Sequence, residues 1–230
     1  VGYSYVDSVD HDAQPPVATR RTGVARFTSD GRLSWNQSAL SGLTVDRMEL
    51  VGGDSDGSTT FQLRLVPEFG KAAPILIVRV APDGTLAWIR EVPTPMASAT
   101  AGPDGTTYVS QYLDNEGESF QALDALDRDG KSLWRARLPM SFGLNDLVAV
   151  DSNGRALVAQ DVSFPQPKSL LVQVSTDGAR CVQYQLEASF MLRSGDISMG
   201  DTPRVVALPD GRVAFATVAE IGIAQLPEVP

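Results

Sequence analysis

The sequence predicts an all-β fold, a β-propeller of four-stranded antiparallel blades with about 4–5 repeat units, of which the first and last are incomplete. One observation is a series of turn glycines: Gly31, Gly57, Gly84, Gly105, Gly130, Gly154, Gly178 and Gly211. Seven of them follow Asp and Gly154 follows Asn153, and such dipeptides between apolar runs are strong hairpin signals. The other observation is that two turn classes alternate, so the pattern recurs about every 45 to 50 residues, as in repeat architectures.

The first turn class contains Gly31, Gly84, Gly130 and Gly178. A large apolar residue stands three positions before each Asp: Phe27, Val80, Leu126 and Val174. Five positions after each Asp stand Trp35, Trp88, Trp134 and, in the last repeat, Val182. We therefore expect the three tryptophans to occupy equivalent places in successive blades, and Trp88 and Trp134 to pack between neighbouring sheets.

The second turn class contains Gly57, Gly105, Gly154 and Gly211 and predicts the hairpin between the first two strands of each repeat. Small residues before these turns suit a strand beside a crowded central axis: Gly53, Ala101, Val150 and Ala207. Each repeat then reads strand, turn, strand, loop, strand, turn, strand. The best example has expected strands at about 147–151, 155–162, 169–175 and 179–186. No long run has helical spacing, so we expect very little helix.

The repeat continues throughout the chain, which predicts a single β-propeller domain, or propeller segment, over residues 1–230. The repeat units span about 1–42, 46–93, 97–139, 146–188 and 203–230. Residues 1–6 align with the second strand of a repeat, and residues 203–226 supply its first strands without a final tryptophan strand. Two arrangements fit: a small ring in which the C-terminal strands complete the first blade, or part of a larger propeller.

Composition limits the function classes. The formal net charge of −9 disfavours nucleic acid and anionic membrane surfaces, which require clustered Lys and Arg. No apolar run is long enough for a membrane-spanning helix, so we expect no membrane insertion, and no signal peptide is visible. The single cysteine, Cys181, cannot form an intramolecular disulfide and is expected to be a packed thiol.

Several segments carry a family resemblance: ARFTSDGRLSWNQS, VRVAPDGTLAWIREV, ALDRDGKSLWRARL, AVDSNGRALVAQD and VVALPDGRVAFAT. They resemble the repeats of bacterial secreted and cell-surface β-propeller proteins and, more loosely, those of quinoprotein-like propellers. The resemblance covers nearly the whole chain. It implies a secreted, periplasmic or cell-surface location and a binding or scaffolding role. The resemblance is specific for the fold and identifies no particular activity, because one fold can host many activities.

The expected topology distinguishes two faces of the disc. The Asp-Gly hairpins lie on one face and are uniform, whereas the loops on the other face differ in length. Variable loops on a rigid scaffold are where binding residues concentrate. We therefore predict apolar contacts from Phe69, Phe142 and Phe164, with Phe190 and Met191 as further candidates, and an acidic rim from Asp10, Asp12 and Glu116. The alternative is that these apolar side chains tuck under their own loops.

Candidate catalytic and metal-binding groups are few. Asp7, Asp10, His11 and Asp12 could ligate a divalent cation, although consecutive loop residues rarely converge on one centre, so a solvated loop is the simpler interpretation. Asp54 and Asp56 begin like a calcium loop, but Leu65 stands where the bidentate Glu belongs. No nucleophile elbow, phosphate loop or dinucleotide fingerprint occurs. No cofactor is predicted.

We therefore expect a non-catalytic protein-interaction or scaffold module that binds a protein or glycan through the variable-loop face. Two alternatives stay open. One is a glycan-active hydrolase or lyase that uses loop carboxylates, which would require two carboxylates facing each other about 5 to 10 Å apart. The other is a purely structural repeat segment of a larger surface protein.

Overall fold

The computed structural model is all-β in the part of the chain that it describes. The described residues are 2–10, 17–37, 40, 43–67, 73–94, 97–115, 118–138, 147–151, 153–162, 168–186, 204–208, 212–216 and 221–225. They form antiparallel sheets and contain no helix, as the sequence predicted. The chain divides into two compact units, Val1–Pro95 and Met96–Pro230.

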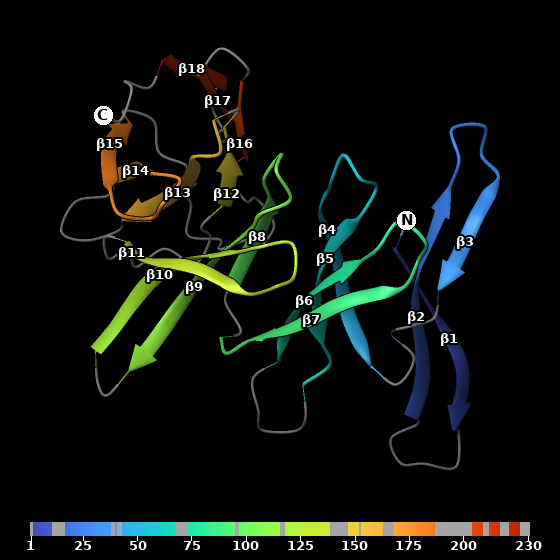
Figure 1. The fold of residues 1–230 in the computed structure, drawn as a ribbon. Coiled ribbons are helices and arrows are strands. Elements are labelled where there is room, and N and C mark those ends of the chain that lie inside the picture. The colour runs from blue at the N-terminus through green and yellow to red at the C-terminus, as the bar shows by residue number, and fades with distance from the viewer. Residues whose placement is uncertain are drawn as a thin grey trace. The chain divides into compact units, whose positions relative to one another are not determined.

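The first unit holds two antiparallel sheets whose strands lie side by side in chain order (Figure 1). The first sheet contains β1 (Gly2–Asp10), β2 (Val17–Phe27) and β3 (Leu33–Gln37). The second sheet contains β4 (Val45–Gly53), β5 (Thr59–Leu65), β6 (Ile75–Val80) and β7 (Leu86–Val92). Val24 of the first sheet packs in one core cluster with Phe61, Leu63 and Val78 of the second.

The second unit holds three sheets with the same chain-order topology. The third sheet contains β8 (Ala97–Ala101), β9 (Thr107–Asn115), β10 (Glu118–Leu126) and β11 (Ser132–Leu138). The fourth contains β12 (Leu147–Val150), β13 (Ala156–Val162), β14 (Lys168–Val174) and β15 (Cys181–Leu186). The fifth contains β16 (Arg204–Ala207), β17 (Arg212–Ala216) and β18 (Ile221–Gln225).

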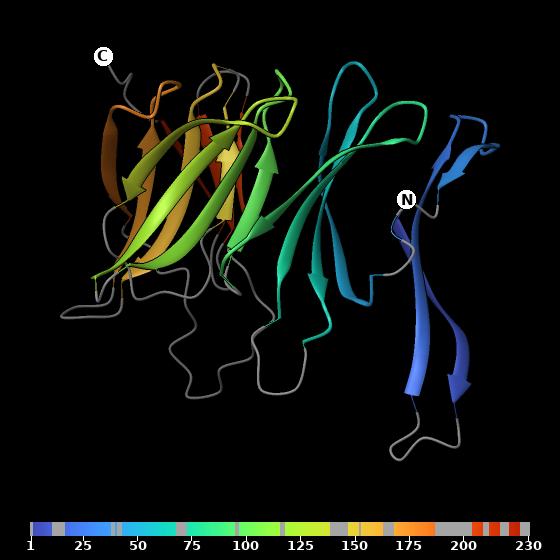
Figure 2. The ribbon, with the colours of Figure 1, turned by 60° about the horizontal axis from the view of Figure 1, so that its bottom comes forward.

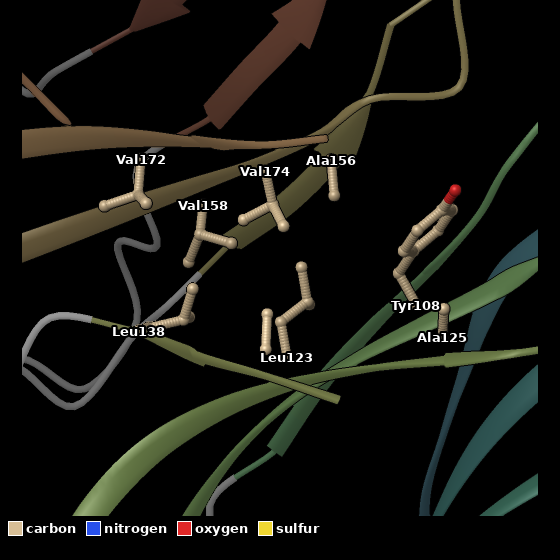
Figure 3. Close-up of a cluster of buried hydrophobic side chains, with 9 residues drawn as sticks. Tyr108, Leu123, Ala125, Leu138, Ala156, Val158, Val172 and Val174 are labelled. Carbon is tan, nitrogen blue, oxygen red and sulfur yellow. The ribbon is translucent and has the colours of Figure 1, made fainter. Parts of the chain in front are cut away.

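The cores of the second unit lie between consecutive sheets. Figure 3 shows Leu123 and Leu138 of the third sheet facing Val158 and Val174 of the fourth. On its other face the fourth sheet packs Leu157 and Leu171 against Val213 of the fifth sheet. The fourth sheet therefore buries apolar side chains on both of its faces, which is the packing expected of stacked repeats.

The strand predictions for the best-defined repeat are confirmed to within two residues at each end, because β12 to β15 coincide with the four expected segments. Among the described residues, the first and fifth sheets contain three strands each. Within each unit, the Asp-Gly turns of both classes lie at one end of the sheets (Figure 2). We call this end the turn end and the opposite end the loop end.

Candidate interaction surfaces

Most of the predicted binding residues lie outside the described part of the chain. Those outside it are Phe69, Phe142, Phe164, Asp12 and Glu116, together with His11, Phe190 and Met191. Asp10 is the last residue of β1, and its backbone lies opposite Val17 of β2. The structure therefore locates the strand ends from which these loops leave, and the loop residues themselves stay predictions.

Connections at the loop end differ in length, whereas those at the turn end are uniform. β9 and β10 are joined by only two residues, 116–117, and β5 and β6 by residues 66–74. The turn-end hairpins instead repeat one four-residue pattern, such as Ala81 to Gly84. The variation in connection length is therefore concentrated at the loop end, and binding residues are found most often on such variable loops.

The turn from Ala81 to Gly84 shows why Asp-Gly recurs. The Gly84 amide donates to the Ala81 carbonyl (2.9 Å), and the Ala81 amide donates to the Thr85 carbonyl (2.8 Å). Gly84 then has φ of 89°, a left-handed conformation that costs a side-chain-bearing residue about 1–2 kcal/mol. The Asp83 carboxylate accepts hydrogen bonds from the Thr85 amide (2.9 Å) and hydroxyl (2.7 Å). Both bonds lower the pKa of Asp83, and the bond from the amide has the larger effect.

In the first unit, Trp35 connects one sheet to the turn of the next. Its indole Nε1 donates to the Pro82 carbonyl at 2.8 Å. The ring covers Gly84, since a β-carbon added there would lie 2.8 Å from Trp35 Cδ2. Arg26, opposite Trp35 on β2, donates to the carbonyls of Pro82 (3.4 Å) and Gly57 (3.2 Å). Both turns of the second sheet are thus bound by the first sheet.

The second unit repeats this arrangement at Trp134. Its Nε1 donates to the Thr176 carbonyl at 2.7 Å, and a β-carbon on Gly178 would lie 2.5 Å from the ring. Tyr108, whose ring centroid is 5.9 Å from that of Trp134, donates its hydroxyl to the Gly154 carbonyl at 2.8 Å. Burial, more than the nearby carboxylates, raises the Tyr108 pKa to about 12, so the hydroxyl stays a donor.

The sequence pattern did not predict this tryptophan contact. Trp134 packs against the core between the third and fourth sheets, as expected, but it is only half-buried, and both Trp35 and Trp134 lie over a turn of the following sheet. The matching spacing of tryptophan and Asp-Gly in each repeat was the available signal. That spacing could have paired each tryptophan with the turn of the following sheet only if it had been known which sheet faces meet.

Buried charges in the described strands are paired with each other. Asp124 accepts two bonds from Arg135 (2.6 and 2.7 Å) and one from Gln111 (2.7 Å). Asp54 is ion-paired with the buried Arg79. Because each carboxylate is already neutralised, these groups serve as structural ion pairs.

The remaining candidate groups are possible metal ligands and a possible nucleophile. Among the described residues, no three His, Cys, Asp or Glu side chains come together to hold a metal ion. The side chains of Asp7 and Asp10 are outside what the structure describes. Cys181 lies exposed at the start of β15, contrary to the expected packed thiol, and partial desolvation raises its pKa, which favours the unreactive thiol form.

No protein-family model matches the chain, and no curated protein matches it significantly. None of the described segments forms a helix with the length and hydropathy needed to cross a bilayer.

Proposed function

We propose that this chain is a β-propeller repeat module of the bacterial envelope or extracellular space. In this proposal it catalyses no reaction and binds a protein or glycan partner at the loop end. The observation that carries the proposal is the contrast between the two ends of the sheets: uniform turns fixed to the neighbouring sheet at one end, and connections of unequal length at the other.

The propeller arrangement is supported by how consecutive sheets pack within each unit. The first sheet packs on the second, and in the second unit the third packs on the fourth and the fourth on the fifth. Each such pair is formed by sheets adjacent in sequence, as blades of a propeller are. Trp35 and Trp134 further connect the outer strand of one sheet to the outer turn of the next.

The loop end is the proposed binding end because the turns of the second and fourth sheets, at the turn end, are occupied by structural contacts. Carbonyls of the turns, such as those of Pro82 and Thr176, accept bonds from the neighbouring sheet. Phe69, Phe142 and Phe164 belong to the loop-end connections and would supply apolar anchors. Asp10, Asp12 and Glu116 would form the rim and, with a net charge of −9, favour a neutral or basic partner.

The experiment compares two matched triple-alanine variants of the full chain. One removes Phe69, Phe142 and Phe164, and the other removes the turn-end side chains Leu33, Leu86 and Leu133, which are exposed in the structure. Each variant, once its circular dichroism and unfolding curve match the wild type, is immobilised to capture partners from envelope and culture fractions.

The proposal expects the loop-end variant to lose a partner that the wild type and the turn-end variant both retain. Equal capture by all three chains would exclude the three phenylalanines as anchors. Hydrolysis of a glycan by the wild type that is lost on replacing Glu116 would overturn the non-catalytic interpretation.

A further inference from the structure

The first sheet carries a turn of the same class as those that receive Trp35 and Trp134, and this turn has no indole on it. Gly31 has φ of 81°, close to the 89° of Gly84 and 72° of Gly178. The Gly31 amide donates to the Thr28 carbonyl at 2.9 Å, which closes the turn as in the other two sheets. The backbone of this turn therefore has the conformation that the tryptophan contact uses.

The surroundings of Gly31 differ from those of the other two glycines. A β-carbon added at Gly31 would meet nothing within 4 Å, whereas at Gly84 and Gly178 it would meet a tryptophan ring. The carbonyl corresponding to those of Pro82 and Thr176 is that of Ser29. Among the described residues, no hydrogen bond to the Ser29 carbonyl is formed.

Phe27 is a second, independent sign of an uncovered surface. It stands three residues before Asp30, as Val80 and Val174 stand before Asp83 and Asp177. Val80 is 2% exposed and packs with Trp35, and Val174 is 0% exposed and packs with Trp134. Phe27 is 50% exposed. Its neighbour Val24 packs on the second sheet, so the uncovered side is the opposite face of β2.

We infer that Phe27, Ser29 and Gly31 form a docking surface for the outer strand of a further β-sheet of this repeat class, whose tryptophan covers Gly31 and donates its indole N–H to the Ser29 carbonyl. The occupant is a tryptophan-bearing sheet because the corresponding surfaces at Gly84 and Gly178 are covered in that way. A second copy would have to release Trp35 or Trp134 from the turn that each covers, or Trp88 from the contact that it already makes, to fill this role. The inference does not depend on the loop-end proposal.

The register of β1 permits a direct test by extending the chain. Gly2 lies opposite Val24, just as Ala159 lies opposite Leu171. Val24 stands three residues before Phe27, and Leu171 stands three residues before Val174, so the two registers match. Gly2 therefore corresponds to Ala159, and residue 1 corresponds to Val158. A copy of residues 96–157 could therefore be joined directly before Val1. It would supply a copy of the third sheet with its tryptophan, then a copy of β12 as the inner strand of the next sheet, and then the first residues of a copy of β13, which β1 would continue.

The extended chain is compared with versions in which the tryptophan of the copy is replaced by Phe or Ala. We expect the added indole N–H to exchange slowly in NMR spectra, and the Ala version to melt several degrees lower. The Phe version should melt in between, because it keeps the ring and loses the donor. Phe27→Ala should lower the melting temperature more in the extended chain than in the 230-residue chain.

Three results would overturn the inference. The added indole could exchange as fast as that of N-acetyl-tryptophanamide, as it would if the extension remained an unattached tail. Phe27→Ala could have the same effect in both chains. The 230-residue chain could also form a dimer in sedimentation experiments that Phe27→Asp dissociates, which would identify a second copy as the occupant.

Discussion

The ring of Trp134 lies so close to Gly178 that no side chain fits there: a β-carbon on Gly178 would be 2.5 Å from Trp134 Cε3. The indole simultaneously donates to the Thr176 carbonyl. Glycine is therefore required at this turn for two separate reasons, its positive φ and the approach of the neighbouring sheet.

These two reasons can be separated by comparing Gly178→Ala with Gly31→Ala and Gly154→Ala. All three glycines have φ between 72° and 81°, so each substitution costs about 1–2 kcal/mol of backbone strain. Gly178→Ala also overlaps the Trp134 ring and should lose about 1–3 kcal/mol more. Urea unfolding measures the difference, and three equal losses would show that Trp134 does not cover Gly178.

The hydrogen bond of the indole is tested by Trp134→Phe. The variant keeps an aromatic ring on Gly178 and leaves the Thr176 carbonyl without its donor, so we expect a loss of about 0.5–1.5 kcal/mol. Trp134→Ala also removes the ring and should cost about 3 kcal/mol, the lower end of the range for a buried aromatic side chain. The same order should appear at Trp35. Equal unfolding midpoints for wild type and Trp134→Phe would argue against the bond.

Asp124 should contribute strongly to the free energy of unfolding, because it is buried and accepts hydrogen bonds from Gln111 and Arg135. Asp124→Ala leaves the buried Gln111 amide and the half-exposed Arg135 without their acceptor, which predicts a loss of about 2–4 kcal/mol. Glu118→Ala is the matched control, because it breaks the exposed ion pair with Arg137 on the same hairpin and should cost much less. Comparable losses from the two substitutions would show that Asp124 is not buried.

Acidification should weaken the turn of the second sheet. The hydrogen bonds from Thr85 hold the Asp83 pKa below its ordinary value of 3.8, so the ionised form is favoured in the folded state. Its contribution to stability is present above that value and is lost as the pH falls through the folded pKa. Thr85→Val removes the hydroxyl donor and should raise the Asp83 pKa part of the way, whereas Thr85→Ser should keep it low. Carboxyl NMR titration measures both, and an unchanged pKa in Thr85→Val would contradict the contact.

The strands and turns could be predicted from the sequence because they depend on local signals. Asp-Gly fixes the turn backbone through the φ of residues such as Gly84, and alternation defines strands such as β14. The Trp35 contact with Pro82 could not be predicted, since it depends on which face of β3 meets which neighbour. Asp124 and Gln111 were missed because a buried polar pair on two strands has no sequence spacing of its own.

At the candidate site, too, local features could be predicted from the sequence and tertiary contacts could not. Loop lengths in the sequence indicated which end of the sheets varies, and the described strand ends agree with that assignment. The direction of Phe69, Phe142 and Phe164 depends on loop conformation, on which the spacing of turns carries no information. The uncovered Phe27 became visible only by comparison with the buried Val80 and Val174.

Within each unit, one tryptophan binds the Asp-Gly turn of the following sheet: Trp35 of the first sheet binds the turn of the second, and Trp134 of the third sheet binds the turn of the fourth. Hydrogen exchange of the indole N–H groups, assigned with Trp35→Phe and Trp134→Phe, measures this bond directly in the intact chain. The account predicts that the Trp35 and Trp134 indole protons exchange far more slowly than that of N-acetyl-tryptophanamide, because Pro82 and Thr176 accept them. Exchange of both at the rate of the free compound would contradict it.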